Sequence, residues 1–275
     1  MEIWDTPAWP RFTHDPARTE GPLAAFSARL GAMSGLHEAL SADERREAFL
    51  RAVTHEAVSS FAIEGATLPA AQIEASVVAS LAHRGREPQR RSDAIATLML
   101  EARAGQGVLD APTLFHWHRL LFHGTEVEDK GRWRSFAMVI ARTAAAGRDE
   151  VLYRAPPATQ VPAMMEDFLT ALPRDTRPLP IRAALAHLWF ESIHPFSDGN
   201  GRLGRAIVEH VFARDSALPF SLSRSIEADK RGYYAALQAG RTVAGDRIDA
   251  TPFVLWFLER LIAGVEDAMA EARFL

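Results

Sequence analysis

Twelve consecutive residues, His194–Arg205, combine side chains that phosphate chemistry uses. The run reads HPFSDGNGRLGR and holds a histidine, an acid, three glycines and two arginines. Glycines allow backbone conformations in which successive N–H groups converge on an anion, and the N-terminus of a following helix adds unpaired N–H groups. Arg202 and Arg205 are three residues apart, so on a helix they share a face where both can hold phosphate oxygens.

The acid and the histidine complete the set. Asp198 lies at the rim of the expected cradle, where one carboxylate can hold Mg²⁺ whose other ligands are water and substrate phosphates. Histidine exchanges protons near neutral pH, so His194 is the natural general base. An ordinary turn between two helices, with arginines on the surface, would explain each of these residues taken one at a time. The whole set in this order instead predicts phosphoryl or nucleotidyl transfer.

Helices are the elements expected to position this run. Apolar residues from Ile181 to Ile193 follow helical spacing and predict a buried helix that ends before Pro195. The first twenty residues show no helical period and are expected to form an arm packed on the body. The same spacing predicts helices over residues 22–36, 42–65, 68–82, 92–105, 111–124, 161–172, 202–216, 226–240 and 251–274.

One segment departs from the helical pattern. Residues 135–140 and 150–154 are β-prone and are joined by a small-residue loop, which predicts a β-hairpin. The polar stretch His83–Arg91 is the best candidate for a boundary between a region 1–90 and a region 91–275. The expected fold class is therefore mainly α, a helical bundle with one hairpin, preceded by a helical N-terminal extension.

Composition narrows the classes of function. The 275 residues carry a formal net charge of −4 and no cysteine, which excludes disulfides, thiolate nucleophiles and cysteine-ligated zinc. The absence of a basic surface argues against nucleic acid as a partner. No signal peptide or membrane-spanning run is expected. We expect a cytoplasmic protein that binds neither nucleic acid nor membrane.

Two alternatives to nucleotidyl transfer remain open. The histidines within His116–His123 do not share one helix face and are interpreted as core or surface residues rather than metal ligands. His187 and His194 are two helical turns apart and, with Asp198, leave a metal-dependent phosphohydrolase possible, although the arginines would then have no role. A non-catalytic regulatory module that has kept the fold is the other alternative.

The run also resembles the signature of Fic-domain proteins, H-P-F-x-D/E-G-N-G-R-x-x-R, at every fixed position. The segment GRWR and the hairpin after it resemble the family's flap, and YYAALQAG and TPFVLWFL resemble its closing helices. Near the N-terminus, IWDTPAWPRF and SSFAIEG resemble the extension that precedes the domain in many bacterial members. The resemblance covers nearly the whole chain and implies a Fic-type helical bundle with the hairpin as flap.

The family's usual activity is transfer of AMP from ATP to a hydroxyl of a target protein. The resemblance implies that His194 deprotonates a Ser, Thr or Tyr hydroxyl and that Asp198 holds Mg²⁺ on the α- and β-phosphates. The target protein would pair with the flap, residues 134–153. The resemblance also implies self-AMPylation and self-association as a homodimer.

Further residues are implied to bind the nucleotide. The amides of Gly199, Asn200 and Gly201 would cradle phosphate, with the Asn200 side chain in contact as well. Arg202 would bind the β-phosphate and Arg205 the γ-phosphate.

Two neighbouring tyrosines are candidates for the adenine site. Tyr233 and Tyr234 offer flat surfaces for adenine, and ordinary core packing is the alternative for each. Arg241 stands where several relatives have Asn after the tyrosine pair, which leaves the choice of base open.

SFAIEG resembles the family's inhibitory motif, [S/T]-x-x-x-E-[G/N], at the end of a helix over about 50–65. Ser60 and Glu64 share a helix face, and Gly65 ends the helix. Glu64 delivered to Arg205 would form a bidentate ion pair and take the arginine that the γ-phosphate needs. The sequence therefore predicts an autoinhibited protein adenylyltransferase. An enzyme that removes AMP, or has both activities, is the alternative.

Overall fold

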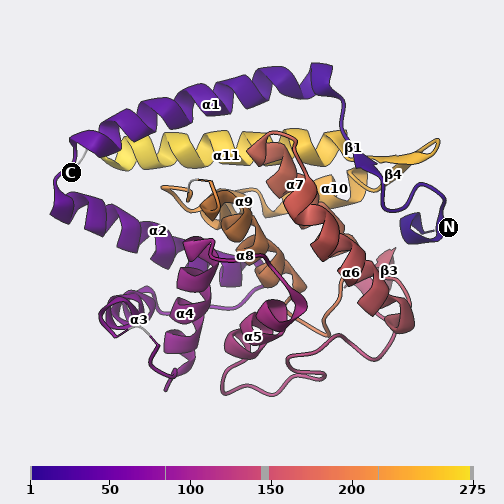
Figure 1. Ribbon diagram of the computed structural model, residues 1–275, viewed down its shortest axis with the longest axis horizontal. Helices are drawn as coiled ribbons and strands as arrows, with labels where there is room; N and C mark the ends of the chain where they lie inside the picture. The colour runs from indigo at the N-terminus through magenta and orange to yellow at the C-terminus, as the bar shows by residue number, and fades with distance from the viewer. Residues whose placement is uncertain (1, 84, 144–148, 216, 273–275) are drawn as a thin grey trace.

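The computed structural model describes the whole chain except residues 1, 84, 144–148, 216 and 273–275. It is mainly helical with small sheets, as predicted (Figure 1). The α-helices are α1 Pro16–Ala39, α2 Ala42–Ile63, α3 Ala70–Ala82, α4 Arg91–Ala104, α5 Ala111–Leu121, α6 Val161–Ala171, α7 Leu179–Ile193, α8 Asn200–Ala213, α9 Leu222–Ala228, α10 Lys230–Ala239 and α11 Thr251–Ala272. The strands are β1 Phe12–Thr13, β2 Val139–Thr143, β3 Asp149–Arg154, β4 Thr242–Ala244 and β5 Arg247–Asp249.

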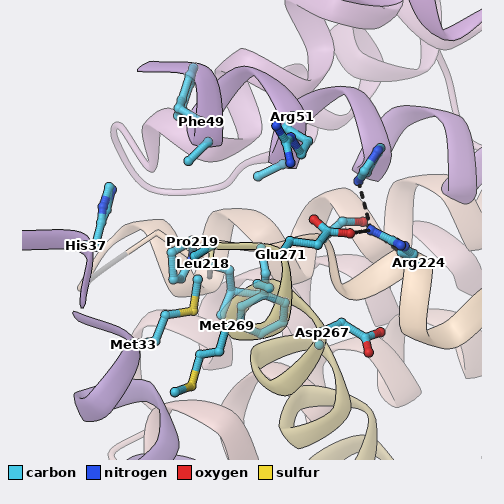
Figure 2. Close-up of a pocket in the computed structure, with 18 of the residues that line it drawn as sticks. Met33, His37, Phe49, Arg51, Leu218, Pro219, Arg224, Asp267, Met269 and Glu271 are labelled. Atoms are coloured by element: carbon cyan, nitrogen blue, oxygen red, sulfur yellow. Dashed lines mark hydrogen bonds and ion pairs between the residues drawn. The ribbon is translucent and has the colours of Figure 1, made fainter. Parts of the chain in front are cut away.

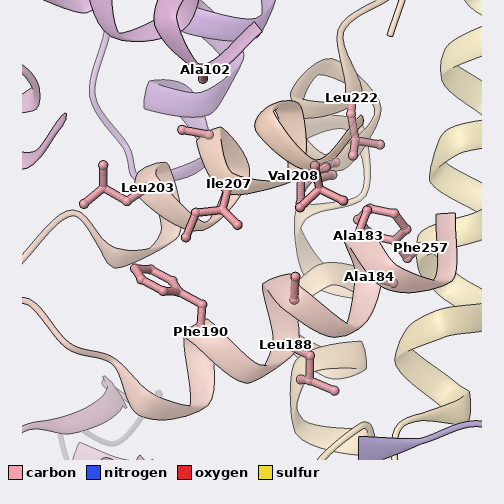
Figure 3. Packing of buried hydrophobic residues seen from close by; sticks show 14 of the residues in the cluster. Ala102, Ala183, Ala184, Leu188, Phe190, Leu203, Ile207, Val208, Leu222 and Phe257 are labelled. Atoms are coloured by element: carbon pink, nitrogen blue, oxygen red, sulfur yellow. The ribbon is translucent and has the colours of Figure 1, made fainter. Parts of the chain in front are cut away.

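Helices α7 and α8 form the centre of the molecule (Figure 3). Helix α7 is mostly apolar and is buried over nearly its whole length, and a helix of that kind is stable only when it is enclosed by others. Its Leu188 and Phe190 are fully buried, as are Leu203 and Ile207 on α8. Burying a side chain of this size contributes roughly 1.5–3 kcal/mol. The loop between α7 and α8, which carries the motif, is therefore fixed at both ends by the core.

Helix α1 lies along α11, so two helices far apart in the sequence are packed side by side (Figure 1). The helix starts at Pro16, inside the stretch expected to be an arm. Asp15 caps it by accepting from the Ala17 N–H at 2.9 Å, and proline is favoured in the first turn. Of the helices described, none is both long and apolar enough to cross a membrane.

The polar stretch chosen as a boundary runs between α3 and α4, which pack against each other. Helix α2 likewise packs against α9. The division into regions 1–90 and 91–275 stays a prediction.

The predicted hairpin is formed by β2 and β3, which pair antiparallel with an irregularity between Ile140 and Ala141. Residues 144–148 of the predicted flap lie outside the described residues. A second small sheet, in the order β1-β5-β4, was not expected. Its strands are only two or three residues long, too short for an alternating pattern to reveal. It joins the N-terminal arm to the segment between α10 and α11.

A buried carboxylate holds α2 against α9. Glu56 is 2% exposed and accepts from the Ser221 hydroxyl at 2.8 Å, the Ser223 N–H at 2.9 Å and the Ser223 hydroxyl. Nearby, Arg103 on α4 forms a buried ion pair with Glu209 on α8, with 2.9 Å between nitrogen and oxygen. Buried charges are stable only when they are paired in this way. The Glu56 contacts help to fix where α2 lies, and the Arg103–Glu209 pair holds α4 against α8.

A buried histidine on α5 holds the motif loop. His118 Nδ1 accepts from the Gly131 N–H at 2.9 Å, so Nε2 carries the proton and donates to the Asp198 carbonyl at 3.2 Å. Its ring stacks on Phe196 with centroids 4.3 Å apart. Burial lowers the pKa of His118 to about 4.

This pKa predicts a pH-dependent stability. The neutral His118 ring is favoured in the folded protein, so its contribution is present above pH ~6.5 and is lost as pH falls from ~6.5 to ~4. Replacing His118 by Phe, which keeps the ring stacking, should flatten the fall in the free energy of unfolding over this range by about 3 kcal/mol. Urea unfolding at several pH values measures it. His116→Phe, at a partly exposed histidine of the same helix, is the matched control. If the free energy of unfolding fell equally with pH in the wild type and in His118→Phe, the lowered pKa of His118 would be contradicted.

Candidate active site

The motif forms the turn between α7 and α8. His194 ends α7 with a left-handed backbone, φ 51°, while its N–H still bonds the Phe190 carbonyl. Gly199 begins α8 at φ 80°, and a Cβ there would lie 2.5 Å from Leu121 Cδ2. Only glycine satisfies both the conformation and the close approach. The Gly199 N–H, one of those predicted to cradle phosphate, donates to the Asp198 carboxylate at 2.5 Å, and α8 begins at the next residue.

Asn200 and Phe196 hold this loop in shape. The Asn200 side chain accepts from the Phe196 N–H and donates to the Phe196 carbonyl, both at 2.9 Å. Asn200 is 2% exposed and Phe196 is fully buried. The amide predicted to contact phosphate is thus turned into the loop, and its contact with a nucleotide stays a prediction.

Arg134 ties the hairpin segment to the end of α7. It is 2% exposed, and its guanidinium donates to the carbonyls of His194 at 2.8 Å, Phe136 at 2.7 Å and Pro156 at 2.6 Å. Its own N–H bonds the Pro195 carbonyl at 2.9 Å. The segment before β2 and the segment after β3 are therefore both fixed to the motif loop.

The His194 ring is largely enclosed, with 17% of its side chain exposed. Its Nδ1 is buried and lies 3.6 Å from Glu191 Oε2. The other nitrogen, Nε2, is the one left to reach a substrate. Sequence reasoning did not select Glu191, although an acid three residues before the histidine on an otherwise apolar helix was a usable signal.

Arg202 is buried between two aromatic rings. Its guanidinium carbon lies 5.1 Å from the ring centroids of both Phe61 and Phe122, a cation–π arrangement. One nitrogen contacts Asp198 Oδ1 at 3.1 Å. The Asp198 side chain remains 59% exposed, so the carboxylate faces solvent at the mouth of the site. Neither phenylalanine was identified from the sequence.

Arg205 is 2% exposed and joins α8 to the end of α2. Its Nη2 donates to Glu64 Oε1 at 2.9 Å and to the Ser60 carbonyl at 2.7 Å, and Nε donates to the Ser60 hydroxyl at 2.9 Å. The pair with Glu64 uses one arginine nitrogen rather than the two expected of a bidentate pair: Ser60 occupies Nε, and Nη1 makes no hydrogen bond within the described residues. Gly65 follows at φ 79° and allows the chain to turn away.

Glu64 also covers the start of α8. A Cβ on Gly201 would collide with Glu64 Oε1, so the carboxylate lies directly over this part of the expected phosphate cradle. The Glu64 side chain is 30% exposed, unlike Arg205, which it contacts. The structure thus brings an anion from another part of the chain to the place where the sequence predicts phosphate.

The two candidate tyrosines have different surroundings. Tyr233 is 1% exposed, with its hydroxyl oxygen 2.8 Å from His187 Nε2. Tyr234 is 40% exposed and is the member of the pair that can present a ring face. Arg241 is held by the Ser192 hydroxyl and the Glu191 carbonyl, each at 3.0 Å. Its guanidinium carbon stacks over the Tyr153 ring at 4.0 Å.

The described part of the chain contains no cluster of three or more His, Cys, Asp or Glu residues that could hold a metal ion. His187 lies in the core beside Tyr233, and His116 pairs with Glu101 at 3.2 Å. The binding of Mg²⁺ by Asp198 stays a prediction.

An apolar pocket of about 240 Å³ lies elsewhere, between α1, α2 and α11 (Figure 2). Figure 2 shows Met33, Leu218, Pro219 and Met269 gathered there, with Arg224 and Glu271 paired at its edge. None of the predicted site residues lines this pocket. The candidate active site is therefore the N-terminal end of α8, where the motif lies, and not the apolar pocket.

Comparison with known proteins gives two family matches. Residues 108–212 match the Fic/DOC family, and residues 3–82 match a domain of unknown function, DUF4172. The first match contains the hairpin, α7 and the whole motif. The second contains α1, α2 and the residues Ser60 and Glu64.

Individual proteins that resemble this chain are also named as Fic proteins. A protein adenylyltransferase Fic of Drosophila willistoni is 24% identical over 242 residues, which are 86% of this chain and 45% of the relative. The chain thus spans less than half the length of that relative. A Fic family protein from Desulfovibrio desulfuricans G20 has a similar structure, with a TM-score of 0.68 and 29% identity over 95% of this chain and 77% of that one.

A Fic domain-containing signaling protein from Bacteroides thetaiotaomicron VPI-5482 shares the fold, with a TM-score of 0.67 and 20% identity over 90% of this chain and 97% of that one. The motif at the α7–α8 turn, the family match over it and the shared fold show that this chain is a Fic-domain protein of the Fic/DOC family.

Proposed function

We propose that this chain is a protein adenylyltransferase that moves AMP from ATP to a Ser, Thr or Tyr hydroxyl of a target protein, and that Glu64 restrains it. The contact between Glu64 and Arg205 carries the proposal, since it brings an anion to the buried arginine at a helix N-terminus. The family of the chain and the name of its Drosophila relative support the reaction class.

The start of α8 would hold the triphosphate. Its free N–H groups and the partial positive charge of the helix favour phosphate there. Arg205 would bind the γ-phosphate once Glu64 moves away, and Arg202 the β-phosphate. Tyr234 offers its exposed ring to adenine. ATP would then occupy the space that Glu64 partly fills in this structure.

Asp198 fits the role of magnesium ligand. It is a mostly exposed carboxylate beside the cradle, and Mg²⁺ is commonly bound by one or two carboxylates with water and substrate phosphates. When bound, Mg²⁺ would supply positive charge against the charge that develops on the phosphate oxygens.

His194 would act as the general base. Its Nδ1 is buried, so Nε2 takes the proton from the target hydroxyl. The hydroxyl oxygen bonds to the α-phosphorus as the bond to the oxygen bridging the α- and β-phosphates breaks. Pyrophosphate leaves, and AMP remains on the target as a phosphodiester.

The target would pair with the hairpin. A two-stranded sheet has free edges that can accept another strand. Val139 on β2 and Val151 on β3 are both exposed, which gives the hairpin apolar contact surface. The same site could act on another copy of this chain.

Removal of the Glu64 carboxylate should relieve the inhibition of AMP transfer. Because a charge-assisted bond is worth about 1.5–3 kcal/mol, Glu64→Gly should raise AMP transfer about tenfold to hundredfold. It should also tighten binding of ATP more than that of AMP, which lacks the γ-phosphate. Labelled-ATP transfer and calorimetry measure the two effects.

Glu47→Gln, at an exposed glutamate of the same helix, is the matched control for this experiment and should leave transfer unchanged. Equal transfer by wild type and Glu64→Gly would contradict the restraint. Faster loss of AMP from a pre-modified target with wild type than with Glu64→Gly would instead assign the removal activity to Glu64.

Loss of the base should abolish transfer without unfolding the protein. His194→Ala in the Glu64→Gly background should lower transfer by about 10²-fold or more, because general bases contribute about 10²–10⁴-fold, while ATP still binds. His116→Ala serves as the histidine control. Transfer that survives in His194→Ala would show that another group takes the proton.

Metal dependence should follow from Asp198. Chelation by EDTA should stop transfer, and Asp198→Asn should require several-fold more Mg²⁺ for half-maximal transfer, because it removes the charged ligand. Asp215→Asn, at the other end of α8, is the control. An unchanged Mg²⁺ requirement in Asp198→Asn would exclude this carboxylate as a ligand.

A further inference from the structure

A line of buried polar side chains runs along α7 to His194. The Tyr233 hydroxyl lies 2.8 Å from His187, and the next polar residues of the helix on this side are Glu191 and then His194. Spacings of four and three residues place these side chains on one face. A Cβ on Gly204 would lie 2.9 Å from His187 Nδ1 and 3.3 Å from Glu191 Oε1. Glycine at this position of α8 leaves room for both groups.

Several polar atoms of this line have no partner. Glu191 Oε1, His187 Nδ1 and His194 Nδ1 are buried and make no hydrogen bond within the described residues. Such atoms are rare in native proteins and call for an explanation. The 3.6 Å between Glu191 Oε2 and His194 Nδ1 is too long for a hydrogen bond. Contacts of catalytic groups are often long before substrate binds and shorten afterwards.

The ionisation state of Glu191 also supports an interaction with His194. Burial opposes ionisation, but the nearby imidazoles of His194 and His187 and the Arg241 guanidinium lower the pKa of Glu191 to about 2. Glu191 is therefore a carboxylate at neutral pH. Arg241 bonds its backbone carbonyl, not its carboxylate.

Two further groups face this line of side chains from neighbouring helices: a guanidinium on α8 and a tyrosine hydroxyl on α10. Arg205 on α8 is hydrogen-bonded to Ser60 and Glu64, and Tyr233 on α10 contacts His187. Besides His187, which lies beside the same Gly204, the group near the Glu191 carboxylate is the His194 ring, with 3.6 Å between Glu191 Oε2 and His194 Nδ1.

We propose that Glu191 is the positioning residue of His194: its carboxylate accepts the Nδ1 proton and leaves the Nε2 lone pair facing the substrate hydroxyl. The inference rests on the proposed function, because it takes His194 as the base. When Nε2 gains the substrate proton, the ring becomes an imidazolium whose positive charge Glu191 offsets. The Nδ1 proton stays on the ring, and Glu191 stays ionised.

The first test is the pH profile of transfer in the Glu64→Gly background. Glu191→Gln keeps the size and an acceptor but loses the charge. It should lower kcat about tenfold to hundredfold, leave KM for ATP nearly unchanged, and shift the acid limb of kcat/KM to lower pH by about one unit. Glu191→Asp keeps the charge but holds it farther from the ring. Its acid limb of kcat/KM should therefore lie between those of wild-type Glu191 and Glu191→Gln. Glu56→Gln, at another buried glutamate, should lower stability without moving the limb.

The second test needs neither transfer nor a variant of Glu191. Nitrogen NMR of histidine-labelled protein, with His194→Ala to assign the signal, reports which ring nitrogen carries the proton. The neutral ring should be protonated at Nδ1; protonation at Nε2, or an acid limb unmoved by Glu191→Gln, would overturn the inference. A Nδ1-protonated ring in a protein that transfers no AMP would support the positioning and refute the proposed function alone.

Discussion

The arrangement of this protein depends on one buried guanidinium. Arg205 lies inside the molecule at the start of α8, and a buried charge without partners costs several kcal/mol. Ser60 and Glu64, about 140 residues earlier in the chain, supply the partners. Helix α2 must therefore end against α8, and Glu56, one turn before Ser60, holds the same helix against α9. The charge that would bind a phosphate thus also stabilises the fold in its absence.

The motif divides into residues that maintain the loop and residues that face the site. Phe196 and Asn200 bond each other, and Arg134 bonds the His194 carbonyl. Because these groups hold the backbone, His194 can keep a left-handed conformation that is unfavourable for a side chain of its kind. The histidine ring then lies beside Glu191, with Nδ1 buried and 17% of the side chain exposed.

Prediction from the sequence succeeded where the signal is local. Helical spacing identified α7 and α8, and β-prone ends joined by a small-residue polar loop identified the hairpin. It found α1 but began the helix at Pro22 rather than Pro16, because the first turn is set by the cap at Asp15 and by Pro16 rather than by an apolar period. It also missed the sheet of β1, β4 and β5, because such short strands form only when distant segments pack together.

The sequence alone determined which chemistry the motif can support, since its base, acid, glycines and arginines lie within twelve residues joined by one turn. It also indicated Glu64 as a partner for Arg205. Tertiary structure decided how each group is used: Tyr233 is buried and Tyr234 exposed, and Asn200 is turned inward. Packing also decided that Ser60 shares Arg205 with Glu64. Those outcomes depend on which surfaces the helices bury, and burial is a property of the whole packed chain rather than of neighbouring residues.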